Sequence, residues 1–429
     1  MPAKLHALFL AALISLLPGA VLAQASKPPI PDTPAGRALA GWLDAFNNGD
    51  SGKLASFLQV QVPWLSADQQ MGQRASTGGY DLASIDGSEP LWIVFHANEK
   101  ASGRQIFGRV VVRLKDPEHI TLLELVSAEA KSAEIVLDES ERHRVIDGAV
   151  RLVNDFYVFP DVAQKITAKL EALEKRGEYR AITDGQIFAV RLEDDLRVLS
   201  GDKHFGVDYF AKENPEEPGP RHHADPRQLA ASNCGFERAD HYPPNIGYLK
   251  LTAFAEPDLC ASTAIAAMSF LADSDALIID LRDNHGGAPR MAALLSSYLF
   301  DEPTHLDDIY DHTNNTIEQS WTFPYLPGKK LTGKPVYVLT ASHTYSVGEE
   351  FCFDLKNLQR ATLVGETTGG GAHPMSPHRI DNHFFIRVPF GRIMNPTTQA
   401  DWEGTGVEPN VKVTAEDALD EALKRARGG

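Results

Sequence analysis

The sequence predicts an α/β protein in which a core of alternating strands and helices follows a helical subdomain and a small α+β accessory domain. Three observations lead to this fold class. From about residue 245 onward, short apolar runs alternate with segments of helical periodicity, as in a layered, largely parallel sheet. Residues 139–200 are helical in pattern, and residues 35–130 place helices before alternating strands. With 429 residues, the chain is long enough for two or three domains.

The first 23 residues, MPAKLHALFLAALISLLPGAVLA, have the pattern of a secretory signal peptide. A lysine precedes an apolar segment at residues 7–16, and Val21 and Ala23 occupy the positions before a cut. We expect cleavage after Ala23, a linker over residues 24–34, and an exported protein in the periplasm or the extracellular space. An uncleaved anchor is the less favoured alternative, because the apolar segment is too short to span a bilayer and no later segment is long enough.

Composition and charge restrict the partners of the chain. Hydrophobic residues make up 43% and charged residues 23%, as in ordinary globular proteins. The formal net charge of −17 argues against nucleic acid or an anionic membrane surface as the main partner. Solubility is the simplest explanation of that charge, and the oligomeric state is left open.

The spacing of the three cysteines matches no zinc pattern, and the sequence predicts neither a metal nor a cofactor. Cys234 and Cys260 flank a predicted strand and could pair in an exported protein, although the sequence does not show how far apart they lie. Cys352 falls within a helical segment and is expected to be a small core residue.

Residues 35–135 form the first predicted unit, an α+β accessory domain. Helical periodicity in PAGRALAGWLDAFNNGDSGKLASFL is interrupted at residues 47–50, and three strands follow: PLWIVFHANE, GRQIFGRVVVRLK and ITLLELVSAE. The element order and the GWLDAFNNGD opening resemble the cone fold of nuclear-transport-factor-like, or SnoaL-like, domains. The role of this domain, whether substrate capture, partner docking or packing, is left open.

Residues 139–204 form a predicted helical subdomain. SERHRVIDGAVRLVNDFYVF has one apolar face, a second helix begins near Pro160, and ITDGQIFAVRLEDDLRVLSG makes a third. Short connections favour packing as a bundle. The bundle is expected to end at SGDKHFGVDYF, where strand alternation begins.

The remaining residues, 205–429, form the predicted α/β core. Its expected strands are IGYLKLTAF, ALIIDLR, PVYVLTA and ATLVG, and its expected helices lie near 257–273, 288–300 and 346–359, with TAEDALDEALKRAR as the last. DNHFFIRVPFGR is expected to form a hairpin-like element. Loops after parallel strands collect at one edge of a sheet, where ligands bind. Three such loops contain residues 280–289, the sequence TASHTYS, and residues 365–374.

Ser346 lies at the predicted start of a helix and has two interpretations. With Glu349 three residues later it matches a capping box, which is the commoner role for such a serine. The positive end of the helix would also favour an oxyanion near the Val347 N–H, so that Ser346 could be a nucleophile. A serine nucleophile needs a base, and the candidate histidines are His204, His343 and His373.

Several segments together resemble the C-terminal-processing and tricorn-core serine peptidase family, in particular the branch related to interphotoreceptor retinoid-binding protein. They are GYLKLTAF, ALIIDLRDNHGG, YVLTASHTYSVGEEF, ATLVGETTGGGAHP and NPTTQADWEGTGVEPNV. The resemblance covers about residues 140–425 and implies a helical N-terminal subdomain followed by a ClpP/crotonase-like core. Processing proteases of this family use a Ser–Lys dyad and usually carry a PDZ domain. Here the lysine position is Gly371, and residues 206–244 are too few for a PDZ domain.

The tricorn-core branch uses serine, histidine and glutamate, and the resemblance maps these roles onto Ser346, His204 in GDKH, and Glu403 in WEGTGVEP. Ser346 would attack the carbonyl, His204 would move the proton, and Glu403 would orient the imidazole directly or through a bridging side chain. The tricorn core has a serine just before its histidine. Here that neighbour is Lys203, so one member of the tetrad is unfilled.

The same resemblance places the oxyanion hole at the Val347 N–H and at Gly286, with Gly287 adjacent. Taken alone, the two glycines are equally compatible with a tight turn. His373 and His378 flank the glycine-rich loop and could line the cleft without a catalytic role.

The sequence thus predicts an exported serine endopeptidase that cleaves a peptide or protein substrate through an acyl-enzyme. One alternative is a binding protein for apolar ligands, because the retinoid-binding relatives use this scaffold without hydrolysis. Another is an esterase-like hydrolase that uses the same site.

Overall fold

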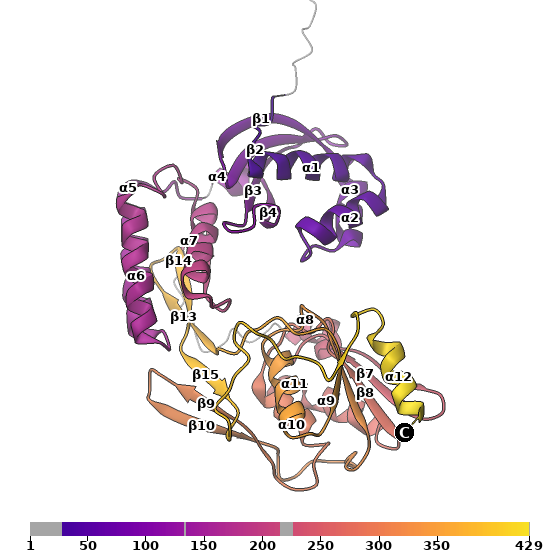
Figure 1. The fold of residues 1–429 in the computed structure, drawn as a ribbon. Helices are drawn as coiled ribbons and strands as arrows, with labels where there is room; N and C mark the ends of the chain where they lie inside the picture. The colour runs from indigo at the N-terminus through magenta and orange to yellow at the C-terminus, as the bar shows by residue number, and fades with distance from the viewer. Residues whose placement is uncertain (1–27, 133, 215–225, 429) are drawn as a thin grey trace, which may run out of the picture.

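The computed structural model describes residues 28–132, 134–214 and 226–428 (Figure 1). The predicted signal peptide and its cleavage site lie outside these residues. The described chain forms a helix-and-sheet domain, a group of helices and an α/β core in the order of the sequence, so the predicted fold class is confirmed.

In the accessory domain, three helices pack on an antiparallel sheet of strand order β1-β2-β3-β4. The helices are α1 (Pro34–Asn48), α2 (Ser51–Gln61) and α3 (Ala67–Thr77), and the strands are β1 (Tyr80–Glu89), β2 (Trp92–Glu99), β3 (Gln105–Val112) and β4 (Ile120–Ser127). The Thr33 side chain caps α1, whose apolar face buries Trp42 in the core shared with the sheet. The break expected at residues 47–50 contains Gly49, whose left-handed conformation ends α1.

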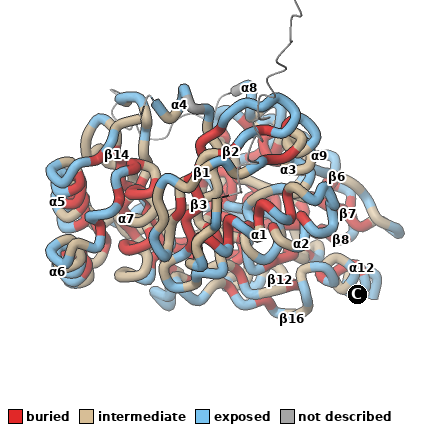
Figure 2. Tube along the Cα trace, turned by 90° about the horizontal axis from the view of Figure 1, so that it is seen from above, coloured by how far each residue is buried: buried red, intermediate tan, exposed pale blue. Residues whose placement is uncertain are grey.

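The helical subdomain consists of α5 (Glu139–Phe156), α6 (Pro160–Lys175) and α7 (Gly185–Ser200). Asp138 and Glu141 form a capping box at the start of α5, and Gly201, at φ 77°, ends α7. Buried and exposed residues alternate along α5 and α6 (Figure 2). The buried faces share one core with the strands β5 (Gly206–Tyr209) and β14 (Phe384–Pro389). The loop between α7 and β5 is therefore held between the helices and the core.

A buried arginine joins the accessory domain to the helical subdomain. Arg109, on β3, is 1% exposed and donates from Nε to Asp184 at 2.9 Å and from Nη1 to Glu124 at 2.6 Å. It also pairs with Glu134, and Lys131 at the end of the short helix α4 (Ala128–Ser132) reaches Asp184 at 2.5 Å. The two parts of the chain are thus locked by charge pairs as well as by apolar contact.

The α/β core is built on a six-stranded sheet of order β16-β12-β11-β8-β7-β6, in which β6 alone runs antiparallel to its neighbour. The strands are β6 (Phe236–Tyr242), β7 (Ile246–Leu251), β8 (Ala276–Asp280), β11 (Val336–Thr340), β12 (Thr362–Gly365) and β16 (Val411–Lys412). On one face lie α9 (Pro257–Phe270), α10 (Pro289–Ser296) and α11 (Val347–Asn357), and on the other lies α12 (Ala418–Gly428). Because both faces are covered, β8 is apolar up to its final Asp280.

Two smaller sheets extend the core, with strand orders β13-β14-β5 and β10-β9-β15. Their further strands are β9 (His305–Asp311), β10 (Thr316–Trp321), β13 (Met375–Arg379) and β15 (Gly391–Met394). Strands β13 and β14 pair antiparallel across a short turn at residues 380–383, so DNHFFIRVPFGR supplies the turn and second strand of a hairpin, as expected. Strand β15, which follows β14 in the chain, pairs in a different sheet. The chain crosses from one sheet to the other around Phe390.

The remaining short elements are α8 (Pro226–Ala231) and a 3-10 turn at Asn233–Gly235. Within that turn, Cys234 forms a disulfide with Cys260 of α9, with Cα atoms 5.9 Å apart. Cys352 is a buried free thiol of α11.

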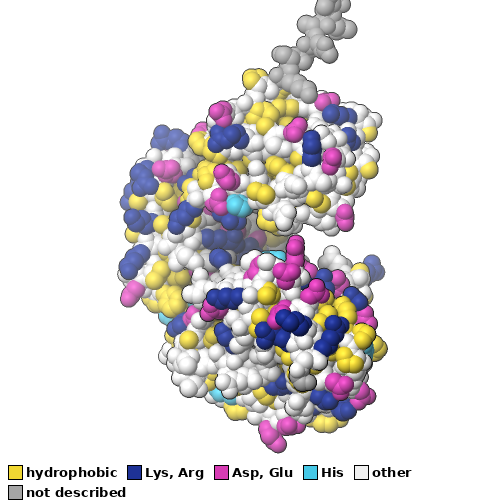
Figure 3. Space-filling view, turned by 45° about the vertical axis from the view of Figure 1, so that its right-hand side comes forward, with side chains coloured by type: hydrophobic (Ala, Val, Ile, Leu, Met, Phe, Trp, Pro, Cys, Tyr) yellow, Lys and Arg dark blue, Asp and Glu magenta, His cyan; other side chains and the backbone are white. Residues whose placement is uncertain are grey.

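Figure 3 shows the molecule hollowed between the accessory domain and the α/β core, with charged side chains of both signs around the hollow. Among the helices of the described residues, none is long and apolar enough to cross a bilayer.

Candidate active site

Four segments that are remote in sequence meet at the carboxyl-end edge of the core sheet. They are the loop between α7 and β5, the N-terminus of α11, the glycine-rich loop after β12, and the loop between β15 and β16. In that order, these segments carry His204, Ser346, His373 and Glu403, which the sequence analysis singled out.

Ser346 sits at the start of α11 in a backbone conformation that is rare for a serine, with φ 55° and ψ −123°. Such strained positions persist only where the surroundings impose them, and they concentrate at functional sites. The Ser346 N–H donates to Glu349 Oε2 at 3.0 Å. The hydrogen bond from the Ser346 N–H to the Glu349 carboxylate, which is one of the two bonds of a capping box, is therefore present. This bond holds the turn that positions the Ser346 side chain.

The loop after β8 passes directly against this turn. A Cβ added to Gly286 would lie 2.7 Å from the Ser346 Cβ and 3.0 Å from the Val347 nitrogen, so only glycine fits there. The Gly286 N–H, however, donates to Asn284 Oδ1 at 2.9 Å. A Cβ added to Gly287, at φ 139°, would lie 2.2 Å from the carbonyl oxygen of Phe254. Both glycines permit the approach of two backbones, and the Gly286 N–H is already hydrogen-bonded within its own loop.

Glu349 holds the glycine-rich loop beside the serine. Its carboxylate is 0% exposed and accepts hydrogen bonds from the N–H groups of Gly370 at 2.6 Å and Gly371 at 2.8 Å, as well as from the Thr368 hydroxyl. Burial raises the pKa of Glu349, while these hydrogen bonds oppose the rise. One buried side chain therefore organises both the Ser346 turn and the loop over it.

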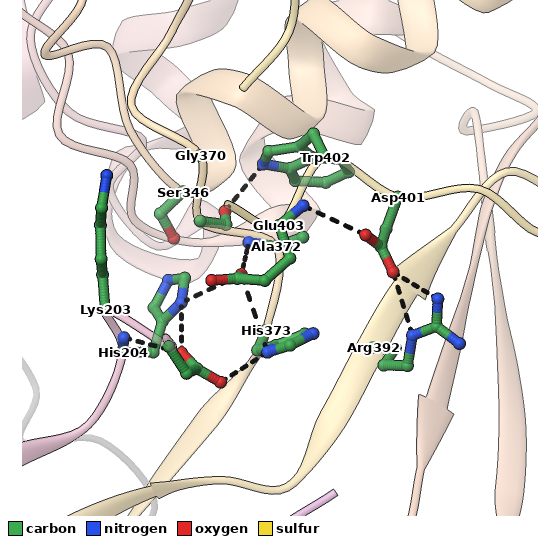
Figure 4. Close-up of polar contacts among 12 residues, drawn as sticks. Lys203, His204, Ser346, Gly370, Ala372, His373, Arg392, Asp401, Trp402 and Glu403 are labelled. Carbon is green, nitrogen blue, oxygen red and sulfur yellow. Dashed lines mark hydrogen bonds and ion pairs between the residues drawn. The ribbon is translucent and has the colours of Figure 1, made fainter. Parts of the chain in front are cut away.

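His204 lies between the serine and a pair of carboxylates (Figure 4). Its Nδ1 is 3.7 Å from Asp202 Oδ1 and 3.9 Å from Glu403 Oε2, and neither ring nitrogen has a hydrogen-bond partner among the described residues. The ring stacks on Tyr345 with centroids 5.1 Å apart, and the Ser346 hydroxyl is directed toward it in Figure 4. The imidazole thus has one nitrogen near negative charge and the other available to the serine.

Asp202 was not among the predicted site residues, although it stands two positions before His204 in GDKH. It is 1% exposed, and its Oδ2 lies 2.6 Å from His373 Nδ1. Burial alone would raise the pKa of Asp202, but hydrogen bonds with His204 and His373 hold it well below its ordinary value. A carboxylate that stays ionised between two histidines adds a permanent negative charge to the site.

Glu403, which faces the same nitrogen of His204 as Asp202 does, is held by the backbone. Its Oε2 accepts the Ala372 N–H at 2.6 Å, and the Nε1 of the neighbouring Trp402 donates to the Gly371 carbonyl at 2.8 Å. Burial, and then the nearby charge of Asp202, raise the pKa of Glu403. Asp202 therefore keeps its charge more readily than Glu403 does.

The two remaining candidate histidines lie differently from His204. His343 is exposed and faces Asp283 at 3.4 Å, whereas His378 stacks on Phe156 with centroids 3.9 Å apart. Only His204 and His373 are brought into the carboxylate cluster.

Lys203, whose presence departs from the tricorn pattern, points away from the carboxylates in Figure 4. Its Nζ donates to the Gly369 carbonyl at 2.6 Å. The lysine thus ties the α7–β5 loop to the glycine-rich loop, which positions the two segments that flank His204.

Asp202, His204 and Glu403 could also hold a metal ion, since one ligand atom from each lies within 4.8 Å of the others. The oxygens nearest His204 already accept hydrogen bonds, however: Glu403 Oε2 accepts the Ala372 N–H, and Asp202 Oδ1 accepts the His204 N–H at 2.9 Å, while Glu403 Oε1 is buried without a partner among the described residues. This arrangement suits proton transfer and stabilisation of an imidazolium better than an ion.

Two family profiles and several known proteins are similar to parts of this chain. Residues 245–413 match the sequence profile of "Peptidase family S41", and residues 127–234 match that of the "N-terminal domain of Peptidase_S41 in eukaryotic IRBP". The chain is 27% identical over 193 residues to carboxyl-terminal-processing peptidase 1, chloroplastic, of Arabidopsis thaliana, covering 44% of this chain and 38% of the relative. It is 30% identical over 149 residues to a carboxyl-terminal-processing protease of Synechocystis, covering 34% and 33%.

Among solved structures, the photosystem II D1 C-terminal processing protease is 15% identical, with a TM-score of 0.43 over 68% of this chain and 97% of that one. The chain spans between a third and a half of the length of the curated relatives it matches.

Proposed function

We propose that this protein is a serine peptidase that uses Ser346, His204, Glu403 and Asp202. The matches of residues 245–413 and 127–234 to the two peptidase S41 profiles support this proposal. The observation that carries the proposal is the position of His204, buried, with Nδ1 beside two carboxylates and its ring stacked on the residue before Ser346. Such an imidazole can accept a hydroxyl proton and be stabilised as an imidazolium.

In the proposed reaction, Ser346 Oγ attacks the carbonyl carbon of a peptide bond while its proton passes to His204 Nε2. The developing oxyanion is stabilised by the Val347 N–H at the positive end of α11, with Gly286 and Gly287 leaving room for it. His204 then gives its proton to the leaving amine, which leaves an ester on Ser346. Water, deprotonated by His204, cleaves that ester and regenerates the serine.

Asp202 and Glu403 act through the imidazole. Both distances to Nδ1 exceed a hydrogen bond, so the ring has to move by several tenths of an ångström, or a water has to bridge, as the proton arrives. Catalytic hydrogen bonds often tighten only when a substrate is bound. Asp202 supplies the steadier charge, and Glu403 helps to orient the ring at the same nitrogen.

We also propose a cellular location and a class of substrate for this protein. The leader pattern supports export, and the names of the curated relatives support a polypeptide substrate cleaved near its C-terminus. The hollow between the accessory domain and the core offers room for an extended chain (Figure 3).

A fluorophosphonate probe tests the proposal directly. We expect stoichiometric labelling of the wild type at Ser346, none in Ser346→Ala, and strongly slowed labelling in His204→Ala. Ser342→Ala is the matched control, because Ser342 is an exposed serine of the same loop. Peptide and ester libraries then separate a peptidase from an esterase. Absence of labelling, together with tight binding of an apolar fluorophore, would replace the peptidase by the binding-protein alternative.

A further inference from the structure

A second acidic cluster lies between helix α11 and strand β9. It consists of Asp307 on β9 and of Glu350 and Asp354, which are one helical turn apart on α11. The three residues are 0%, 1% and 3% exposed. One carboxylate oxygen from each lies within 4.8 Å of the others, so three acids converge on one point inside the protein.

The oxygens of this cluster lack partners. Both oxygens of Asp307, Oε2 of Glu350 and Oδ1 of Asp354 are buried and have no hydrogen-bond partner among the described residues. No lysine or arginine of those residues forms an ion pair with any of the three. Burying an ionised carboxylate without a partner is strongly unfavourable, so something must neutralise the cluster.

We propose that the cluster binds one hard divalent cation, such as Ca²⁺, which ties β9 to α11. All of the donors are oxygens, which is the ligand type that Ca²⁺ and Mg²⁺ prefer. Ligand atoms within 4.8 Å of one another can share an ion at the usual Ca²⁺–oxygen distances of about 2.3–2.6 Å. Ser320, which pairs with Asp307 across the β9–β10 ladder, adds a neutral hydroxyl at the same place.

Bound protons are the competing way to neutralise the cluster. Burial raises the pKa of Asp307 to about 6 and raises those of Glu350 and Asp354 well above their ordinary values. Two shared protons could join the four unpaired oxygens in two O–H···O hydrogen bonds and would cancel two of the three negative charges. A divalent cation cancels the same two charges through direct contact with all three side chains, so measured metal binding decides between the two states.

Such an ion would link strand β9 to helix α11, which Ser346 precedes. Glu350 is one turn and Asp354 two turns beyond Ser346 on α11. Strand β9 pairs with β15, after which the chain continues into the loop of Glu403. The ion would therefore stabilise the elements that carry two residues of the proposed site without touching either of them.

The test uses the full mature chain stripped with a chelator and then dialysed. We expect one Ca²⁺ or Mg²⁺ per chain by elemental analysis and calorimetry, and a rise in Tm of at least about 3 °C at saturating cation. Glu350→Gln and Asp354→Asn should each weaken binding at least tenfold and remove most of the Tm rise.

Glu174→Gln is the matched control, because Glu174 belongs to a solvent-exposed group of possible ligands on the helical subdomain and should leave binding unchanged. Absence of stoichiometric binding to the wild type would overturn the proposal in favour of bound protons. Unchanged binding in both helix variants would also overturn it. Metal binding is also measured directly on the wild type. The experiment therefore distinguishes a bound cation from bound protons even if a variant fails to fold.

Discussion

Asp202 and His373, 171 positions apart in the sequence, are joined by a hydrogen bond of 2.6 Å between Oδ2 and Nδ1. The other oxygen of Asp202 faces His204 at 3.7 Å. Asp202 therefore connects the proposed base to a second histidine, and the two carboxylates that face Nδ1 of His204 are not equivalent.

The first prediction compares these two carboxylates. Hydrogen bonds with the histidines hold the pKa of Asp202 low, whereas burial raises that of Glu403. Asp202→Asn should therefore lower kcat/KM by about 10²–10⁴, mostly through kcat, and Glu403→Gln should lower it less. Steady-state kinetics on a cleavable peptide checks this. A larger loss for Glu403→Gln would show that Glu403 carries the charge that matters.

The second prediction concerns the pH dependence of stability through His373. Burial alone would lower the pKa of His373, but Asp202 and Glu403 raise it above its ordinary value. A group whose pKa is raised on folding contributes stability that is complete below its unfolded pKa, near 6.5, and is lost as pH rises through its folded pKa. The stability advantage of the wild type over His373→Asn should thus shrink as pH rises above about 6.5. Denaturant titrations from pH 5.5 to 9 measure it, and an advantage that grows with pH would contradict the assignment.

The third prediction tests the junction of the accessory domain. Arg109→Met leaves Asp184, Glu124 and Glu134 clustered without their buried cation, so the free energy of unfolding should fall by about 3–5 kcal/mol. Urea unfolding provides the measurement. Arg37→Met, which removes an exposed pair with Asp32, should have no measurable effect. Equal behaviour of the two variants would mean that apolar contacts alone hold the junction.

The fourth prediction concerns Glu349, which accepts four hydrogen bonds from the serine turn and the glycine-rich loop. Glu349→Gln keeps the size but turns one acceptor into a donor, so stability should fall by about 1–3 kcal/mol and labelling of Ser346 should slow. Calorimetry and probe kinetics report the two effects. Glu408→Gln, at an exposed surface pair, should change neither. Normal labelling in Glu349→Gln would mean that the reactivity of Ser346 does not depend on how Glu349 holds the glycine-rich loop.

The three predicted catalytic residues were assigned from the sequence because the resemblance to the tricorn-core branch maps onto short motifs, each beside a recognisable local feature. Ser346 precedes a helix, His204 follows the glycine that ends a helix, and Glu403 precedes a glycine-rich turn. The roles of these residues in catalysis stay predictions until the probe experiment is done. Asp202 escaped notice because its partners are set by tertiary packing, above all His373 from a distant loop.

The parts of the fold that the sequence did not reveal are mainly polar strands. Strand β9, HLDDIYD, carries three aspartates, and aspartate is depleted in strands, so its pattern resembles a loop. Strand β10 is mostly exposed on both faces and shows no apolar alternation. The division of β14 and β15 between two sheets depends on partners elsewhere in the chain, which local periodicity cannot specify.

Gly371 decides which of two chemistries this scaffold can host. A Cβ at this position would lie 2.4 Å from the Tyr345 ring and 2.6 Å from His204 Cε1. The space that a dyad lysine would occupy is already filled by the stacked aromatic pair, so a single Gly371→Lys exchange would collide with it. A lysine at position 371 would therefore require Tyr345 and His204 to move or to be replaced by smaller residues first.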